Sequence, residues 1–202
     1  MRIIVLDAMG VIYSVAYDDR DLLRPFVEEK GGTKDESKIE MLYDSTSLGK
    51  MSSAEFWEAV GLDPKLEDEY LQRYELTDGL IDFLAAVNSQ GYEVWCLSND
   101  VSEWSKKLRA RFGLDKYIRG FVISGDVGVR KPEEAVFAHL IGQLAESPCD
   151  AVFVDDQRRN LDAATALGFH TILFAPAGRA LTGEKHVVVT SFADILCWLC
   201  SR

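Results

Sequence analysis

The chain has 202 residues, of which 48% are hydrophobic and 27% are charged, and its formal net charge is −11. Length and apolar content suffice for one globular domain, with room for a smaller inserted one. The acidic balance argues against nucleic acid and membranes as partners, because both are bound through clustered lysines and arginines. The first apolar run, residues 3–6, is too short for a signal peptide, and no run of about 18 apolar residues follows, so we expect a cytoplasmic protein.

Short apolar runs and helical patterns alternate over most of the sequence. The runs end in small, polar or acidic residues, and their continuous apolarity is typical of parallel strands covered on both faces. The predicted strands are residues 2–7, 92–100, 120–126, 150–156 and 170–176. The predicted helices between them are residues 77–91, 102–113, 131–147 and 160–169. This order predicts right-handed crossovers and a doubly wound, Rossmann-like α/β core.

Residues 14–76 interrupt this alternation. They show only helical patterns rich in acidic residues, and they follow the first predicted strand directly. We therefore predict a helical cap at 14–76, inserted into a core formed by residues 1–13 and 77–202. Ligands of open parallel sheets bind beyond the carboxyl ends of the strands, so an insertion at this point would overhang the site as a lid.

Two smaller features complete the predicted organisation. Within the cap, Phe56, Trp57 and Val60 share a helical face. This face is expected to be the core of the cap, although a surface for a protein partner is an alternative. After residue 176, the apolar run at 187–190 predicts an edge strand, and an amphipathic helix is expected from there to the end of the chain.

Polar and charged side chains stand at the ends of the predicted strands. Because the carboxyl ends of parallel strands meet at one edge of a sheet, we expect these side chains to converge. They are Asp7, Ser98, Asn99, Asp155 and Asp156, with Lys131 at the start of a helix in the same layer. Asp100 and Asp126 also end strands, but a role as a helix cap or turn residue is as good an interpretation for them.

These residue types together predict a phosphate site. Clustered carboxylates repel one another unless a cation lies between them, and hard oxygen ligands suit magnesium. A carboxylate facing that ion can attack phosphorus and form an aspartyl phosphate. Ser98 and Lys131 would supply a hydrogen bond and a positive charge to the non-bridging phosphoryl oxygens. We therefore expect a small, phosphorylated substrate.

Four segments, IIVLDAMGV, CLSND, GVRKP and VFVDDQRRNLDAATALGF, resemble the four motifs of the haloacid dehalogenase superfamily of hydrolases. They occur in the family's order and at its usual separations, over about residues 1–13 and 77–175. The helices at 14–76 are similar in place to the small cap that the family carries after its first motif.

The resemblance assigns a role to each motif residue. It implies that Asp7 is the nucleophile and a metal ligand, and that Ser98, Asn99 and Lys131 hold the phosphoryl group. It further implies magnesium as the cofactor. The implied ligands of the ion are Asp7, the backbone carbonyl of Met9, Asp156 directly, and Asp155 directly or through water.

Met9 departs from the family pattern. Phosphatases of this family usually read Asp-x-Asp, and the second Asp protonates the leaving alcohol and later deprotonates the attacking water. A thioether transfers no proton, so an acid/base contribution of roughly 10²- to 10⁴-fold should be missing. The metal site need not be affected, because any residue at this position offers a backbone carbonyl.

Three interpretations remain open. The first is a phosphatase that is slow, that acts on leaving groups needing little protonation, or in which water or a cap residue replaces the missing acid. The second is a dehalogenase, since a halide leaves without a proton. The third is a non-catalytic relative that binds a phosphorylated ligand or a protein. The intact pair Asp155 and Asp156 favours magnesium and phosphorus, because a dehalogenase is expected to lack these acids.

The choice of substrate is expected to depend on the cap and on the loop after Met9. Candidate contacts are Tyr13, Tyr17, Arg20 and Arg24. An arginine near the site could hold a second anionic group, although packing or a surface role is the more common function of such residues. The sequence names no particular substrate.

Overall fold

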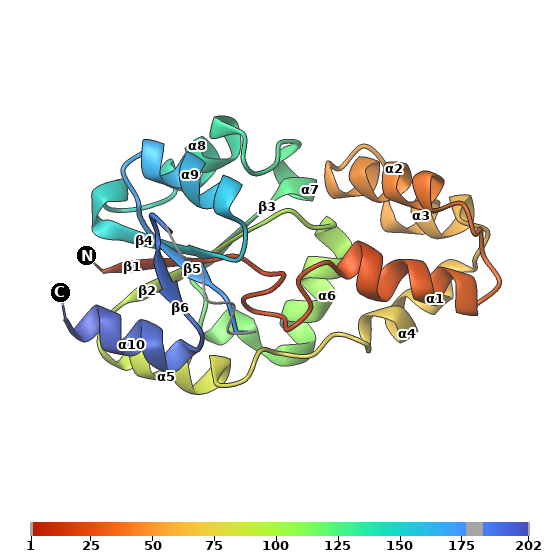
Figure 1. Ribbon diagram of the computed structural model, residues 1–202. Helices are drawn as coiled ribbons and strands as arrows, with labels where there is room; N and C mark the ends of the chain where they lie inside the picture. The colour runs from red at the N-terminus through yellow and green to blue at the C-terminus, as the bar shows by residue number, and fades with distance from the viewer. Residues whose placement is uncertain (1, 177–183, 202) are drawn as a thin grey trace.

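The computed structural model describes residues 2–176 and 184–201, and its centre is a six-stranded sheet in the order β3-β2-β1-β4-β5-β6 (Figure 1). All neighbouring strands are parallel. The strands are β1 (Ile3–Leu6), β2 (Glu93–Ser98), β3 (Gly120–Ile123), β4 (Ala151–Asp155), β5 (His170–Phe174) and β6 (Val187–Val189). This topology confirms the predicted doubly wound α/β class. Of the predicted core, residues 1, 177–183 and 202 lie outside the described residues.

The apolar runs of the sequence become central strands because both faces of the sheet are covered. Every residue of β1 and β4 is buried. Alternate residues of β1 enter different apolar clusters, Ile4 and Leu6 on one face and Ile3 and Val5 on the other. A strand buried on both faces has no polar positions to offer, which is why its sequence shows no alternation.

Helices cover the two faces. On the face of Ile4 lie α5 (Leu80–Ser89), α6 (Ser102–Phe112) and α10 (Phe192–Cys200), and on the other face lie α8 (Glu134–Ile141) and α9 (Arg158–Ala166) (Figure 1). The short elements of the core are η3 (Leu114–Lys116), α7 (Ser124–Val127) and η4 (Pro148–Asp150). The helix predicted at 131–147 is shorter than expected. Pro132 stands near its start, and α8 begins only at Glu134.

Between β1 and α5 the chain forms helices that lie beyond the carboxyl ends of the strands (Figure 1). These helices, hereafter the cap, are η1 (Asp19–Leu23), α1 (Arg24–Glu29), α2 (Glu36–Ser47), α3 (Ser53–Ala59), η2 (Pro64–Leu66) and α4 (Glu67–Leu71). Helix α3 starts at a capping box in which Ser52 and Glu55 satisfy each other's backbone amides. An antiparallel bridge between Tyr13 and Leu76 joins the two connections to the core. The exact limits of the cap, 14–76, remain a prediction.

The cap shares one apolar cluster with the core. Trp104 of α6 is fully buried, and its ring lies 5.6 Å from Phe56, 5.8 Å from Trp57 and 5.0 Å from Tyr70. Phe56, Trp57 and Val60 are themselves buried, so they form part of this interior and not an exposed surface for a partner.

Candidate active site

Three carboxylates meet at the carboxyl edge of the sheet. Asp7 directly follows β1, Asp155 ends β4, and Asp156 comes next in the chain. The sheet register pairs Leu6 with Val154, so Asp7 and Asp155 lie side by side. One oxygen from each of the three carboxylates lies within 4.8 Å of the others. The first and last of the four motifs therefore come together as the parallel topology requires.

Lys131 lies between two of these carboxylates. Its Nζ is 2.7 Å from Asp7 Oδ1 and 2.8 Å from Asp155 Oδ2, and the whole side chain is buried. A buried ammonium is stable only with such partners, since transfer of a charge out of water is costly. Lys131 therefore holds the nucleophile candidate and the fourth motif in one ion-pair network.

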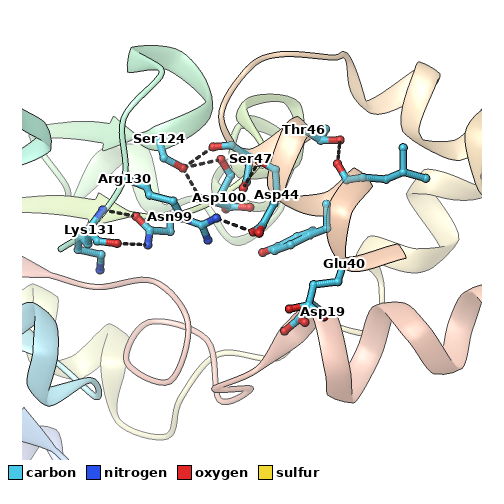
Figure 2. A network of polar contacts seen from close by, with 12 residues as sticks. Asp19, Glu40, Asp44, Thr46, Ser47, Asn99, Asp100, Ser124, Arg130 and Lys131 are labelled. Atoms are coloured by element: carbon cyan, nitrogen blue, oxygen red, sulfur yellow. Dashed lines mark hydrogen bonds and ion pairs between the residues drawn. The ribbon is translucent and has the colours of Figure 1, made fainter. Parts of the chain in front are cut away.

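Asn99 holds the backbone of Lys131 in place (Figure 2). The amide N–H of Lys131 donates to Asn99 Oδ1 at 2.7 Å, and Asn99 Nδ2 donates to the Lys131 carbonyl at 3.0 Å. Both ends of the Asn99 side chain are thus used for a single residue. This contact joins the loop after β2 to the loop that carries Lys131.

Asn160, predicted from the sequence only as part of a helix, also belongs to the site. From the first turn of α9, its Nδ2 donates to both oxygens of Asp155, at 3.1 and 3.0 Å. The backbone N–H of Gln157 donates to Asp155 Oδ1 as well, at 2.7 Å. These bonds fix the orientation of a fully buried carboxylate. The signal in the sequence is an asparagine five residues after Asp155, in the first turn of the helix that follows it.

The site carries an excess of negative charge. Burial raises the pKa of the Asp7 carboxyl well above its ordinary value, the Asp155 carboxylate acts in the same direction, and Lys131 opposes both. Burial and the Asp155 carboxylate likewise raise the pKa of Asp156 to about 6. Burial alone would lower the pKa of Lys131, but the two carboxylates outweigh it and the net change is upward. One lysine does not balance three carboxylates, and hard oxygen donors at this spacing fit a magnesium ion.

A small cavity opens above these residues. It has a volume of about 130 Å³, and its charged lining consists of Asp7, Asp18, Asp19, Asp156, Arg130, Lys131 and Arg159. A wider outer cavity of about 490 Å³ shares Asp19, Tyr43, Arg130, Lys131 and Arg159 with it and extends toward α2 of the cap. The inner cavity has room for a phosphoryl group, and the outer cavity has room for a larger attached group.

Met9 and Ser98 differ in how they relate to the inner cavity. Met9 is 7% exposed and lines it, at the place where the family pattern has an aspartate. Ser98 is 1% exposed and is not part of the lining. In the part of the chain that the structure describes, its hydroxyl finds no hydrogen-bond partner.

The sequence matches the haloacid dehalogenase-like hydrolase family over residues 1–168. The chain belongs to this family. The resemblance to the haloacid dehalogenase superfamily, noted from four short motifs, is therefore confirmed as membership of this family.

The chain is also similar in sequence to a named hydrolase and a named phosphatase. Over 104 residues it is 26% identical to flavin mononucleotide hydrolase 1 of Arabidopsis thaliana, and over 106 residues it is 30% identical to phosphoglycolate phosphatase of Nitrosococcus oceani. Each match covers 52% of this chain, and 42% and 47% of the respective relative. The chain thus matches about half the length of these relatives.

Solved structures of the family share the fold. A HAD phosphatase from Thermococcus onnurineus superposes with a TM-score of 0.75 at 22% identity, over 98% of each chain. A HAD family enzyme from Bacteroides thetaiotaomicron, in complex with magnesium and inorganic phosphate, gives a TM-score of 0.76 at 19% identity, over 90% of this chain and 98% of the other.

The arginines that line the cavities differ from those that the sequence indicated. Arg20 pairs with its neighbour Asp21, and neither Arg20 nor Arg24 lines the two cavities. Arg24 instead binds three cap carboxylates, those of Asp19, Glu36 and Glu40. Arg130 and Arg159 line both cavities. Both lie inside quoted motif segments, Arg130 in GVRKP and Arg159 in VFVDDQRRNLDAATALGF, and this position is the signal that could have found them.

The two tyrosines singled out from the sequence have different places. Tyr17 lines the inner cavity and is 45% exposed. Tyr13 is buried, with its ring 5.6 Å from that of Tyr74, so it is part of the interior.

Across residues 2–176 and 184–201, no helix is both long and apolar enough to cross a membrane.

Proposed function

We propose that this chain is a magnesium-dependent phosphatase that cleaves small phosphate esters through an aspartyl phosphate on Asp7. The observation that carries the proposal is the arrangement of Asp7, Asp155 and Asp156 within 4.8 Å, with Lys131 bound to two of them. The similarity to phosphoglycolate phosphatase and to flavin mononucleotide hydrolase 1 supports phosphorus as the atom attacked.

Asp7, Asp156 and the backbone carbonyl of Met9 would hold the magnesium ion, and Asp155 would hold it directly or through water. When bound, the ion supplies positive charge that offsets repulsion between the carboxylates and an incoming phosphate. Burial and the Asp155 carboxylate raise the pKa of both Asp7 and Asp156, and a bound cation would offset both effects.

The remaining steps, attack on phosphorus and hydrolysis of the intermediate, involve residues of the chain itself. A carboxylate oxygen of Asp7 attacks phosphorus, and the bond from phosphorus to the leaving oxygen breaks. Lys131, which lines the inner cavity, would stabilise the non-bridging oxygens, where negative charge is spread in the transition state. Ser98 does not line the cavity, and its buried hydroxyl would have to turn toward the phosphoryl group to donate to one of these oxygens. Asn99 positions Lys131 through the backbone. Water then attacks the aspartyl phosphate, which restores Asp7 and releases inorganic phosphate.

The two cavities suggest how the substrate lies. The phosphoryl group would occupy the inner cavity of about 130 Å³, and the rest of the molecule would extend into the outer cavity of about 490 Å³. Arg130 and Arg159 line both cavities, so either could contact an anionic part of the substrate.

The test is release of phosphate from a panel of alkyl, aryl and acyl phosphates. We expect turnover that needs magnesium and is abolished by Asp7→Asn. Asp21→Asn is the matched control, since Asp21 is an exposed aspartate whose ion pair, among the residues that the structure describes, is with its neighbour Arg20. Binding of magnesium alone, followed by calorimetry, should weaken at least tenfold in Asp156→Asn. Turnover that survives Asp7→Asn overturns the proposal, and phosphate binding without any turnover leaves the chain a binding protein.

Hydrolysis of carbon–halogen bonds is a second candidate because of Met9, which lines the cavity and carries no proton. A halide leaves without one. The acidic pair Asp155 and Asp156 opposes this activity, since a cation beside Asp7 would weaken its attack on carbon. We expect no halide release from 2-haloacids. Halide release that increases when magnesium is chelated would favour the dehalogenase.

A further inference from the structure

Hydrolysis of an alkyl phosphate needs two proton movements that Met9 cannot perform. One proton goes to the leaving oxygen, and another is taken from the attacking water. Met9 lines the inner cavity, yet its thioether neither binds nor releases a proton at ordinary pH. The question is whether another side chain of the same cavity is free to exchange protons.

Asp18 is the carboxylate of this cavity that has no other assignment. Of the four lining carboxylates, Asp7 and Asp156 belong to the proposed metal site, and Asp19 is paired with Arg24 at 3.2 Å. No histidine, cysteine or glutamate is among the described residues that line the cavity. Tyr43 also lines it, but burial and the nearby Asp18 carboxylate raise the pKa of its phenol well above the ordinary value, which is too high for this role. Tyr17 lines it too, but it is 45% exposed and accepts a hydrogen bond from Gln157.

The carboxylate of Asp18 is held by neutral groups. It is 4% exposed and accepts hydrogen bonds from Tyr74 at 2.8 Å and from Tyr43 at 3.1 and 3.2 Å. Tyr70 continues the chain of hydroxyls, 2.8 Å from that of Tyr74. In the described ranges, Asp18 forms no ion pair with a lysine, arginine or histidine. It can therefore gain or lose a proton without breaking an ion pair.

The surroundings place the ionisation of Asp18 in a useful range. Burial raises its pKa to about 6, against the bonds from Tyr74 and Tyr43, which favour the ionised form. Asp19 on the same segment raises it further. On the core side of the contact between cap and core lies buried Asp100, whose own pKa is raised by burial and by Asp18. A group that ionises near the working pH is the best suited to give and take a proton.

We infer that Asp18 exchanges the protons that Met9 cannot. Protonated Asp18 would donate to the leaving oxygen as its bond to phosphorus breaks, and the alcohol would depart neutral. The Asp18 carboxylate would then take a proton from the water that attacks the aspartyl phosphate. After one cycle, Asp18 is protonated again, and one ester and one water have become one alcohol and one phosphate. The inference rests on the proposed phosphatase activity.

The first test compares an alkyl phosphate with p-nitrophenyl phosphate in the native chain and in Asp18→Asn. Because p-nitrophenolate leaves without a proton, Asp18→Asn should change kcat/KM for p-nitrophenyl phosphate less than threefold. For the alkyl phosphate, kcat/KM should fall about 100-fold. In the native chain, kcat/KM for the alkyl phosphate should decline above about pH 6, because Asp18 loses the proton that it donates. This decline should be absent from the variant. Asp21→Asn, an exposed change on the same segment, should match the native chain on both substrates.

The second test restores the family pattern with Met9→Asp. Once a carboxyl stands at position 9, Asp18 should be dispensable, so adding Asp18→Asn should lower kcat/KM on the alkyl phosphate less than threefold. A merely structural role of Asp18 predicts the same loss in both backgrounds. This comparison does not depend on the stability of one variant, since both single changes and the double change are measured together.

The outcomes separate this inference from the proposed function. If Asp7→Asn leaves phosphate release unchanged, the proposed function fails and this inference fails with it. If Asp7 is essential but Asp18→Asn has equal effects on both substrates, or none, only the role of Asp18 is overturned. The same holds if the native chain cleaves p-nitrophenyl phosphate and no alkyl phosphate at all.

Discussion

The cap meets the core in two places that differ in chemistry. Toward α6 the contact is an aromatic interior, in which Trp104 packs among cap residues and its Nε1 donates to buried Glu67 at 2.9 Å. Toward α7 and the Lys131 loop the contact is polar. There, Ser124 donates to the carbonyl of Ser47, and Arg130 binds Asp44, at 2.5 Å in each case (Figure 2).

This difference indicates how the cap is held. A packed aromatic cluster is costly to separate, whereas partly exposed ion pairs contribute little. The cavities lie on the polar side, lined by Arg130 and Tyr43. The aromatic side therefore attaches the cap to the core, and the polar side is left to contact substrate. The following changes test this division, from the largest expected effect to the smallest.

Trp104→Ala should cause the largest loss of stability. Trp104 is fully buried, and removal of such a ring leaves a cavity that typically costs about 3–5 kcal/mol. Urea unfolding measures the free energy. Trp198→Ala on α10 is the matched control, because that tryptophan is only partly buried and should cost far less. Equal losses in the two variants would contradict an anchoring role of the aromatic side.

Asp18→Asn should change how stability depends on pH. Asp18 lies where the two sides meet, since Tyr43 comes from α2 and Tyr74 from the return to the core. An unfolded aspartate ionises near pH 3.8, whereas the folded pKa is about 6. The native chain therefore loses stability through this group as the pH rises from about 4 to about 6, and the loss persists above that range.

The variant has no such ionisation. Relative to the native chain, Asp18→Asn should gain on the order of 2–3 kcal/mol between about pH 3 and pH 7. Unfolding by urea at the two pH values gives the difference. A relative loss of stability as the pH rises would mean that the Asp18 carboxylate is a structural group best satisfied when it is ionised.

Asp44→Asn should have the smallest effect on folding. The ion pair with Arg130 is partly exposed, and such pairs contribute at most about 1 kcal/mol. The expected readout is instead kinetic. Arg130 loses its partner, so KM for a phosphate substrate should change by severalfold while kcat stays near the native value. A stability loss of several kcal/mol would show that the polar side also anchors the cap.

Much of the fold followed from the sequence because its strands are buried on both faces. Runs such as residues 150–156 could then be read as parallel strands, and parallel strands bring Asp7 and Asp155 to one edge. The boundaries of α8 were less predictable, since Pro132 lies in a turn before the helix and not in its first turn.

The rest of the site depends on contacts between segments that are distant in the chain. Asp18 reaches the cavity because Tyr43 and Tyr74, 25 and 56 residues away, pack against it. Helical periodicity at 14–76 carries no information on which cap residue faces the motifs. Arg24 shows the opposite outcome. The sequence indicated it as a candidate contact, but three cap carboxylates hold it away from the cavities.

Asn99 holds the Lys131 loop through two hydrogen bonds, and this has a consequence for mutagenesis. Its two hydrogen bonds go to the backbone of Lys131 and use no atom of the lysine side chain. A different side chain at position 131 would leave both bonds available, so the loop should keep its course. Substitutions at this position can therefore report the effect of the missing ammonium charge separately from any rearrangement of the loop.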